Sequence, residues 1–217
     1  MMLTQYNQKT FRNILGAIAF IFALAVMASA QEAAARSAIA NIGIENFGQM
    51  DERFYRGAQP KTKDDFKALA DLGIRTVIDL RDDPMKYERP MVESLGMRYV
   101  HIPMVSKKYP TEEVVQTFLR VVNDPATGKF FVHCAGGRHR TGAMGAVYRY
   151  NFYHWSFDQV YTEMKIYDFY TRWGHENFKT FVEDYYARMQ ASGGANHAAI
   201  ITPPLNTAPT RSEQRKR

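Results

Sequence analysis

The chain has 217 residues and a formal net charge of +6, and its residues are 46% hydrophobic and 23% charged. These values are those of an ordinary globular protein, and they exclude a mostly disordered, collagen-like or coiled-coil chain. The single cysteine excludes a disulfide framework and a zinc site built from several thiolates.

The excess positive charge lies at the two ends of the chain. Residues 1–30 contain two basic residues and no acidic one, and residues 190–217 contain four basic residues and one acidic one. Residues 31–189 contain 22 basic and 21 acidic residues, a net charge of +1. Because this body is nearly neutral, we expect no broad surface for nucleic acid and no nucleic-acid partner.

Residues 1–30 have the pattern of a secretory signal peptide. Lys9 and Arg12 precede an apolar run over Ile14–Ala28, and Ala28-Ser29-Ala30 has the small residues of a cleavage site. Cleavage after Ala30 predicts a periplasmic or secreted protein without further membrane contact. The alternative is an uncleaved membrane anchor, for which the run is short, because a spanning helix needs roughly 20 apolar residues.

Strands and helices alternate in the first half of the body, after a predicted linker at 31–41. Thr62 and Asp65 have the spacing of a helix capping box, and Gly73 is suited to end that helix. The expected elements here are strands at 42–49 and 54–56, a turn at 57–60, a helix from Thr62 to Gly73 and a strand at 76–80.

The alternation continues to the end of the body. The expected elements are a loop at 82–89, a helix at 91–95, a strand at 98–102, a helix from Thr111, a turn at 124–128, a strand at 129–133, and helices at 141–153, from Ser156, and at 176–189. This order predicts a single α/β domain over 42–189, with a mostly parallel central sheet flanked by helices. Residues 190–217, rich in glycine, proline and basic residues, are predicted to be a disordered basic tail.

The segment from Phe130 to Gly142 has the pattern of an anion site. A tight loop between a strand and a helix can turn its backbone N–H groups inward, and the helix N-terminus adds more N–H groups. Gly136 and Gly137 allow close backbone approach and a positive φ.

A thiol lies at the mouth of this loop. Cys134 directly follows the predicted strand, and Arg140 offers a planar fork that can bind two phosphate oxygens. The same N–H groups and Arg140 would lower the pKa of the Cys134 thiol. A thiolate at the base of an anion site is suited to covalent phosphoryl transfer.

This segment resembles the Cys-x5-Arg signature of the cysteine-dependent protein tyrosine and dual-specificity phosphatases. His133-Cys134, Gly137 and Arg140-Thr141-Gly142 match every defined position of that signature. A looser resemblance covers about residues 50–188 and includes Tyr55–Pro60 and Val77–Arg81. The basic Arg138-His139-Arg140 stretch is similar to the small atypical dual-specificity group, which includes phosphatases acting on inositol pyrophosphates.

The resemblance implies a role for each matching position. Cys134 would be the nucleophile, and Arg140 would bind phosphate and stabilise the transition state. Thr141 would hydrogen-bond the cysteine and assist its departure, and His133 would hold the loop and tune the thiolate. The backbone N–H groups that would bind phosphate belong to Ala135, Gly136, Gly137, Arg138, His139 and Arg140. No metal and no cofactor is expected.

The general acid implied by the resemblance is missing at its usual place, because Pro103–Pro110 contains no carboxylate. The nearest acids are Glu112 and Glu113 at a helix start and Asp82 and Asp83 after a strand end. A helix-start charge and a solvated turn explain these pairs without a catalytic role, so the general acid stays unassigned. Lys107 and Lys108 could instead contact extra phosphates, although exposed lysines are usually only solvated. Without an acid, good leaving groups would be preferred.

The leading hypothesis is a metal-independent phosphatase that hydrolyses phosphate monoesters of proteins or small molecules through a cysteinyl phosphate. Alternatives are a phosphate-binding protein without turnover, a phosphatase for inositol (pyro)phosphates or other non-protein substrates, and a thiol-based sulfur or arsenate transferase. A buried structural Cys134 is disfavoured by the motif around it. A zinc site from His133, Cys134 and His139 lacks a fourth ligand. The sequence leaves the substrate and the oligomeric state open.

Overall fold

The computed structural model of the protein describes residues 42–191. The predicted signal peptide and linker up to residue 41, and the predicted tail from residue 192, lie outside the described residues and stay predictions. No helix within 42–191 is long and apolar enough to cross a membrane.

A five-stranded sheet forms the centre of the domain. Its order is β1 (Gly48–Gln49), β2 (Phe54–Ala58), β5 (Phe130–Cys134), β3 (Thr76–Arg81) and β4 (Arg98–Met104). The strands β2, β5, β3 and β4 run parallel, and only the edge strand β1 pairs antiparallel. The expected α/β domain with a mostly parallel sheet is therefore confirmed.

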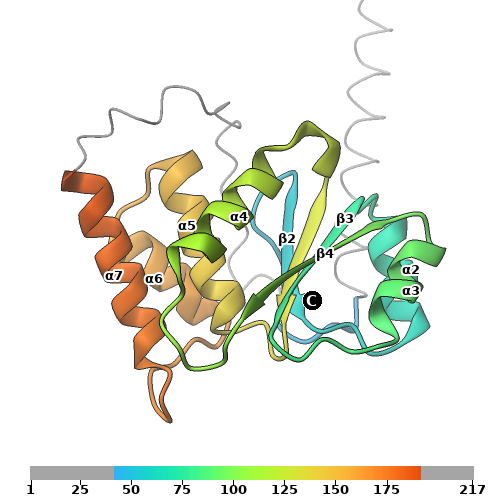
Figure 1. Ribbon diagram of the computed structural model, residues 1–217, viewed down its shortest axis with the longest axis horizontal. Coiled ribbons are helices and arrows are strands. Elements are labelled where there is room, and N and C mark those ends of the chain that lie inside the picture. The colour runs from blue at the N-terminus through green and yellow to red at the C-terminus, as the bar shows by residue number, and fades with distance from the viewer. Residues whose placement is uncertain (1–41, 192–217) are drawn as a thin grey trace, which may run out of the picture. The chain divides into compact units, whose positions relative to one another are not determined.

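Helices cover both faces of this sheet (Figure 1). On one side lie α2 (Lys63–Asp71) and α3 (Glu88–Ser94). On the other lie α4 (Glu112–Asn123), α5 (Arg140–Tyr153), α6 (Phe157–Ile166) and α7 (Glu176–Ala191). A short 3-10 helix, Pro125–Thr127, leads into β5. Thr62 forms the expected capping box with Asp65, which satisfies free N–H groups at the start of α2.

Some element boundaries differ from the sequence expectation. The strand expected over 42–49 is limited to Gly48–Gln49, because Asn46 has a left-handed φ of 53° that bends the chain. The turn expected from Gly57 begins later, since β2 continues to Ala58 while it pairs with β5. Helix α3 starts at Glu88, inside the expected loop, and α7 extends to Ala191, inside the expected tail.

The strand register brings three strand ends together beside Cys134. In the parallel ladders Ala58 lies opposite Cys134, and Asp79 lies opposite His133. Ligand sites of open α/β sheets form at these carboxyl ends. Helix α5, which follows Cys134, is buried from Arg140 to Phe152. The loop between β5 and α5 is thus held at both ends by central elements of the core.

Candidate active site

The loop between β5 and α5 is held from outside by donors of the preceding segment. The carbonyl oxygens of residues 135, 136 and 137 each accept one hydrogen bond. Their donors are, in order, the backbone N–H of Gln59 (3.3 Å), the side-chain amide of Asn46 (2.9 Å) and Nη2 of Arg56 (2.6 Å). Sequence reasoning did not assign a role to Asn46 or Arg56. Arg56 lies in the run Tyr55–Pro60, which belongs to the looser family resemblance, and that resemblance could have pointed to it.

Gly137 is required by the packing of this loop. Its φ is +67°, and a Cβ there would lie 2.4 Å from the backbone carbon of Gly57. Gly136 differs from the expectation, because it is absent from the glycines with a positive φ. A Cβ on Gly136 would meet only the flexible end of Arg138, at 2.8 Å. The close approach of this loop to the Gly57 backbone therefore requires glycine at position 137 but not at position 136.

The Cys134 thiol lies at the base of the loop and is 4% exposed. Burial acts to raise its pKa, but the Thr141 hydroxyl, the Arg140 guanidinium and the N–H groups of Thr141 and Gly137 together lower it below the ordinary value. The Thr141 hydroxyl is buried without a hydrogen-bond partner among residues 42–191. It is therefore available to the sulfur, as the resemblance implies.

Arg140 is held at the loop by two acceptors. Its Nη1 donates to Oδ1 of Asp82 at 2.6 Å and to the Met104 carbonyl at 3.0 Å. Asp82 also accepts from the N–H of Ser106 at 3.2 Å. Burial acts to raise the pKa of Asp82, but the N–H groups and Arg140 lower it overall. The Asp82 carboxylate thus joins the loops after β3 and β4 to Arg140.

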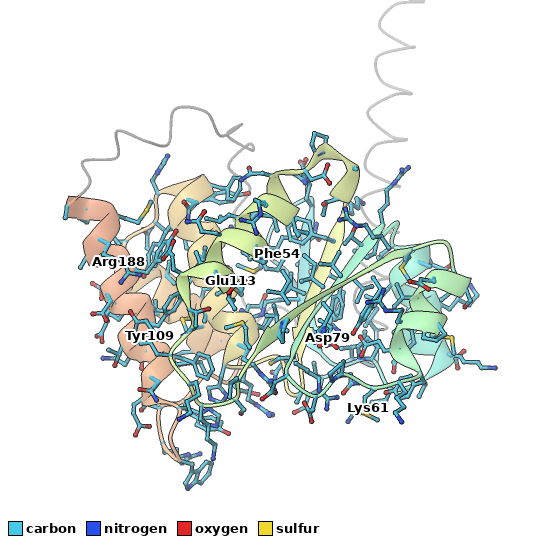
Figure 2. The ribbon with its side chains drawn as sticks, viewed as in Figure 1. Phe54, Lys61, Asp79, Tyr109, Glu113 and Arg188 are labelled. Carbon is cyan, nitrogen blue, oxygen red and sulfur yellow. The ribbon has the colours of Figure 1, made fainter. Side chains whose placement is uncertain are left out.

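Of the four acids considered from the sequence, Asp82 is the one that contacts Arg140. Asp83 is exposed and pairs with Arg81 at 2.9 Å. Glu112 and Glu113 are exposed in the first turn of α4, where acidic residues complement the helix dipole. Figure 2 shows Glu113 on the side of the molecule that carries Tyr109 and Arg188.

The side chains of Arg138 and His139 are engaged away from the sulfur. Arg138 forms an ion pair with Glu45. The His139 ring stacks on His175 with a centroid distance of 3.6 Å, and its Nε2 lies 3.0 Å from the Tyr170 carbonyl. Burial first, and then His175, lower the pKa of His139 to about 4. Both residues can still offer their backbone N–H groups to the loop.

His133 belongs to a buried charged group behind the loop. Its Nε2 lies 2.6 Å from Glu88, and its Nδ1 lies 3.9 Å from Asp79, a residue labelled in Figure 2. Burial acts to lower the pKa of His133, but Glu88 and Asp79 raise it overall. These three residues could hold a metal ion by their spacing. Tyr99 donates to Asp79 at 2.7 Å, and Gln59 donates to the other oxygen of Glu88 at 3.1 Å. The His133 Nε2 and Glu88 Oε1 atoms have each other as an ion pair, so each of the three side chains has a polar contact without an ion.

The loop between α6 and α7 forms part of the surroundings of the site and was not singled out from the sequence. It carries Trp173, which is 67% exposed. The Arg172 guanidinium lies over the Trp173 ring, 4.4 Å from the ring centre. The Lys107 side chain lies beside this loop, since a Cβ added to Gly174 would be 3.3 Å from the Lys107 Cδ atom. Lys107 also contributes to lowering the pKa of His175, after burial.

Known proteins share this chain's sequence pattern and its fold. Residues 36–179 match the model of a family described as DSP-PTPase phosphatase fused to NAD+ kinase. The chain is 28% identical over 125 residues to the "Probable tyrosine-protein phosphatase DG1060" of Dictyostelium discoideum, covering 55% of this chain and 74% of that protein. It is 26% identical over 106 residues to "Inositol diphosphatase DSP5" of Arabidopsis thaliana, covering 46% of this chain and 50% of that protein.

The fold is similar to that of a solved phosphatase domain. The core catalytic domain of the PP-IP phosphatase SIW14 from S. cerevisiae, in complex with citrate, gives a TM-score of 0.56 at 20% identity. The similarity covers 76% of this chain and 98% of that one. At this identity the likeness shows a shared fold.

Proposed function

This chain belongs to the family described as DSP-PTPase phosphatase fused to NAD+ kinase, and we propose that it hydrolyses phosphate monoesters through a cysteinyl-phosphate intermediate. The observation that carries the proposal is the Cys134 thiol. Its pKa, which burial acts to raise, is lowered overall by the Thr141 hydroxyl, Arg140 and two loop N–H groups. That combination favours a thiolate in a site suited to a phosphate dianion.

The proposed reaction has two steps. The Cys134 thiolate attacks phosphorus, a sulfur–phosphorus bond forms, and the bond to the leaving oxygen breaks as that oxygen takes a proton from solvent water. Water then attacks the phosphorus, which releases inorganic phosphate and regenerates the thiolate. Arg140 and the loop N–H groups stabilise the charge on the phosphate oxygens, and the Thr141 hydroxyl supports the departing sulfur.

The proposed substrate is a phosphorylated protein or small molecule. The relatives include one named a tyrosine-protein phosphatase and one named an inositol diphosphatase, so both substrate classes belong in a first panel. A tyrosine phosphopeptide, an alkyl phosphate and an inositol pyrophosphate compared at equal concentration would separate the protein reading from the inositol reading.

The central experiment uses the purified protein and an aryl phosphate in the presence of EDTA. We expect phosphate release, inhibition by orthovanadate, and complete loss of turnover in Cys134→Ser with an unchanged circular dichroism spectrum. Full activity of Cys134→Ser would refute the mechanism. Phosphate binding with no release from any substrate in the panel would support a binding protein without turnover instead.

Export is proposed from residues 1–30 alone. A mature N-terminus at Gln31 would support cleavage and a periplasmic or secreted location. A mature N-terminus at Met1 would contradict cleavage and favour the anchor.

A further inference from the structure

The donors outside the loop fix the direction of its peptide groups. The carbonyls of residues 135–137 all accept hydrogen bonds from the segment that contains Asn46 and β2. No peptide bond in the described chain is cis. In a planar trans peptide the carbonyl and the following N–H point in opposite directions. The N–H groups of residues 136, 137 and 138 therefore point away from these donors.

One of these N–H groups has an identified acceptor. The backbone N–H of Gly137 is among the groups that lower the pKa of Cys134, against the larger opposing effect of burial. This N–H belongs to the peptide whose carbonyl Asn46 holds at 2.9 Å. The Asn46 side chain thus holds, from outside the loop, the peptide group that carries the Gly137 N–H.

Arg56 holds the next peptide and adds a charge. Its side chain is 1% exposed, Nη2 donates to the Gly137 carbonyl at 2.6 Å, and the guanidinium lies 4.0 Å from the Tyr167 ring centre. Its Nε is buried without a hydrogen-bond partner in residues 42–191. A buried cation with an unsatisfied donor is a poor stabilising device, since desolvation is costly. A role in the site explains its placement better.

We propose that Asn46 and Arg56 are positioning residues of the phosphatase reaction, aiming the N–H groups of Gly137 and Arg138 at the sulfur and the phosphate by holding the preceding carbonyls outward. The inference rests on the proposed function, because it assumes that this loop binds the reacting phosphate. The fixed peptides form a preorganised anion site, which needs no rearrangement when charge develops.

The two residues predict different defects. Asn46→Gly keeps the left-handed backbone but removes the donor, so the Gly137 peptide is free to rotate. We expect the thiol pKa to rise by about one unit, the size of one hydrogen bond to a charged group. Arg56→Met removes the donor and the charge, and we expect phosphate and vanadate to bind at least about tenfold more weakly. Arg56→Lys should restore part of that loss.

Alkylation by iodoacetamide as a function of pH measures the thiol pKa, and calorimetric titration with inorganic phosphate measures anion affinity. Neither readout requires turnover, so a failure of the proposed function, shown by an active Cys134→Ser, remains distinguishable from a failure of this inference. Asn46 is only partly buried, and its variant keeps the test available if Arg56→Met does not fold.

Arg53→Met is the matched control. Arg53 also donates to two backbone carbonyls, those of Gly128 at 3.3 Å and Val122 at 3.1 Å, but at the other end of β5. We expect it to lower the melting temperature without moving the thiol pKa or the phosphate affinity. Folded Asn46→Gly and Arg56→Met proteins that match the wild type in both quantities would overturn the inference. So would equal changes in Arg53→Met.

Discussion

Oδ1 of Asp82 lies 2.6 Å from Nη1 of Arg140, so the arginine proposed to bind phosphate is paired with a carboxylate before any substrate arrives. The arginine is buried, whereas the side chain of Asp82 is 32% exposed. A phosphate dianion that binds Arg140 must therefore compete with this negative charge. Asp82 fixes the direction of the Arg140 guanidinium, and its negative charge is expected to lower the affinity of the site for phosphate.

Asp82→Asn is expected to tighten the binding of inorganic phosphate. The neutral amide removes the competing charge but can still accept a hydrogen bond from Arg140. The gain should be roughly two- to fivefold, the size of a partly exposed ion pair, and should shrink at high salt. Competitive inhibition by phosphate measures it. Asp83→Asn is the control, because Asp83 pairs with Arg81 at the surface, and weaker phosphate binding in Asp82→Asn would contradict the competition.

The same variant tests whether Asp82 is the unassigned general acid. A carboxylate that only orients Arg140 should affect aryl and alkyl phosphates to the same extent. Selective slowing of alkyl phosphates, whose leaving oxygen needs a proton, would identify Asp82 as the acid.

The sequence predicts the loop well because its chemistry is local. Cys134, Gly137 and Arg140 lie within one strand–loop–helix segment, so their spacing alone places them together. Asn46 and Arg56 lie 90 and 81 positions from the carbonyls they hold. The Arg56 contact depends on the parallel pairing of β2 with β5, and the Asn46 contact depends on the turn before β1. No periodicity in the sequence specifies either placement.

The acid candidates show the same limit. Asp82 and Asp83 are neighbours in the sequence with identical side chains, and nothing local separates them. The adjacency of β3 and β5 places the first beside Arg140 and leaves the second with Arg81 at the surface. The predicted turn at Gly57 was wrong for a related reason, since pairing with β5 extends β2 through it.

Gly137→Ala is expected to lower the turnover rate about a hundredfold or more, because the loop must move to make room for Cβ. Its Cβ would lie 2.6 Å from the Ala58 nitrogen, and backbone at this distance cannot yield cheaply. Gly96→Ala is the matched control: Gly96 also has a left-handed φ, +75°, but a Cβ there meets nothing within 4 Å. The control should lose only about 1–2 kcal/mol of stability from backbone strain. Assays of turnover and thermal melting on both variants decide the matter, and an active Gly137→Ala would contradict the steric argument.

Thr141→Val is expected to raise the thiol pKa of Cys134 by about one unit, since it replaces the hydroxyl that faces the sulfur with a methyl group of similar size. Thr141→Ser keeps the hydroxyl and should keep the pKa. The pH dependence of inactivation by iodoacetamide measures both. Equal pKa values in the valine and serine variants would show that the hydroxyl does not act on the sulfur.

His139 predicts a loss of stability in mild acid. Burial, and then the stacked His175, lower its pKa in the folded state from 6.5 to about 4. Between these values the unfolded chain binds a proton that the folded chain does not, so the free energy of unfolding decreases as the pH falls from 6.5 toward 4. His175, whose pKa burial and Lys107 lower, acts in the same direction. His133 has a raised pKa and acts in a separate window above pH 6.5, where its contribution is lost as the pH rises.

His139→Phe keeps a planar ring in the stack but removes the titrating group, so its stability should fall less between pH 6.5 and pH 4 than that of the wild type. Urea unfolding at several pH values across that range gives the slope of the unfolding free energy against pH, and this slope should be smaller in His139→Phe than in the wild type. His154→Asn is the control, because His154 is an exposed residue at the end of α5 with a left-handed φ of 53°, which asparagine also adopts. The control should keep the wild-type slope. A His139→Phe protein with that same slope would show that the folded His139 ring takes up its proton near the ordinary pH, and that the stack with His175 does not oppose it.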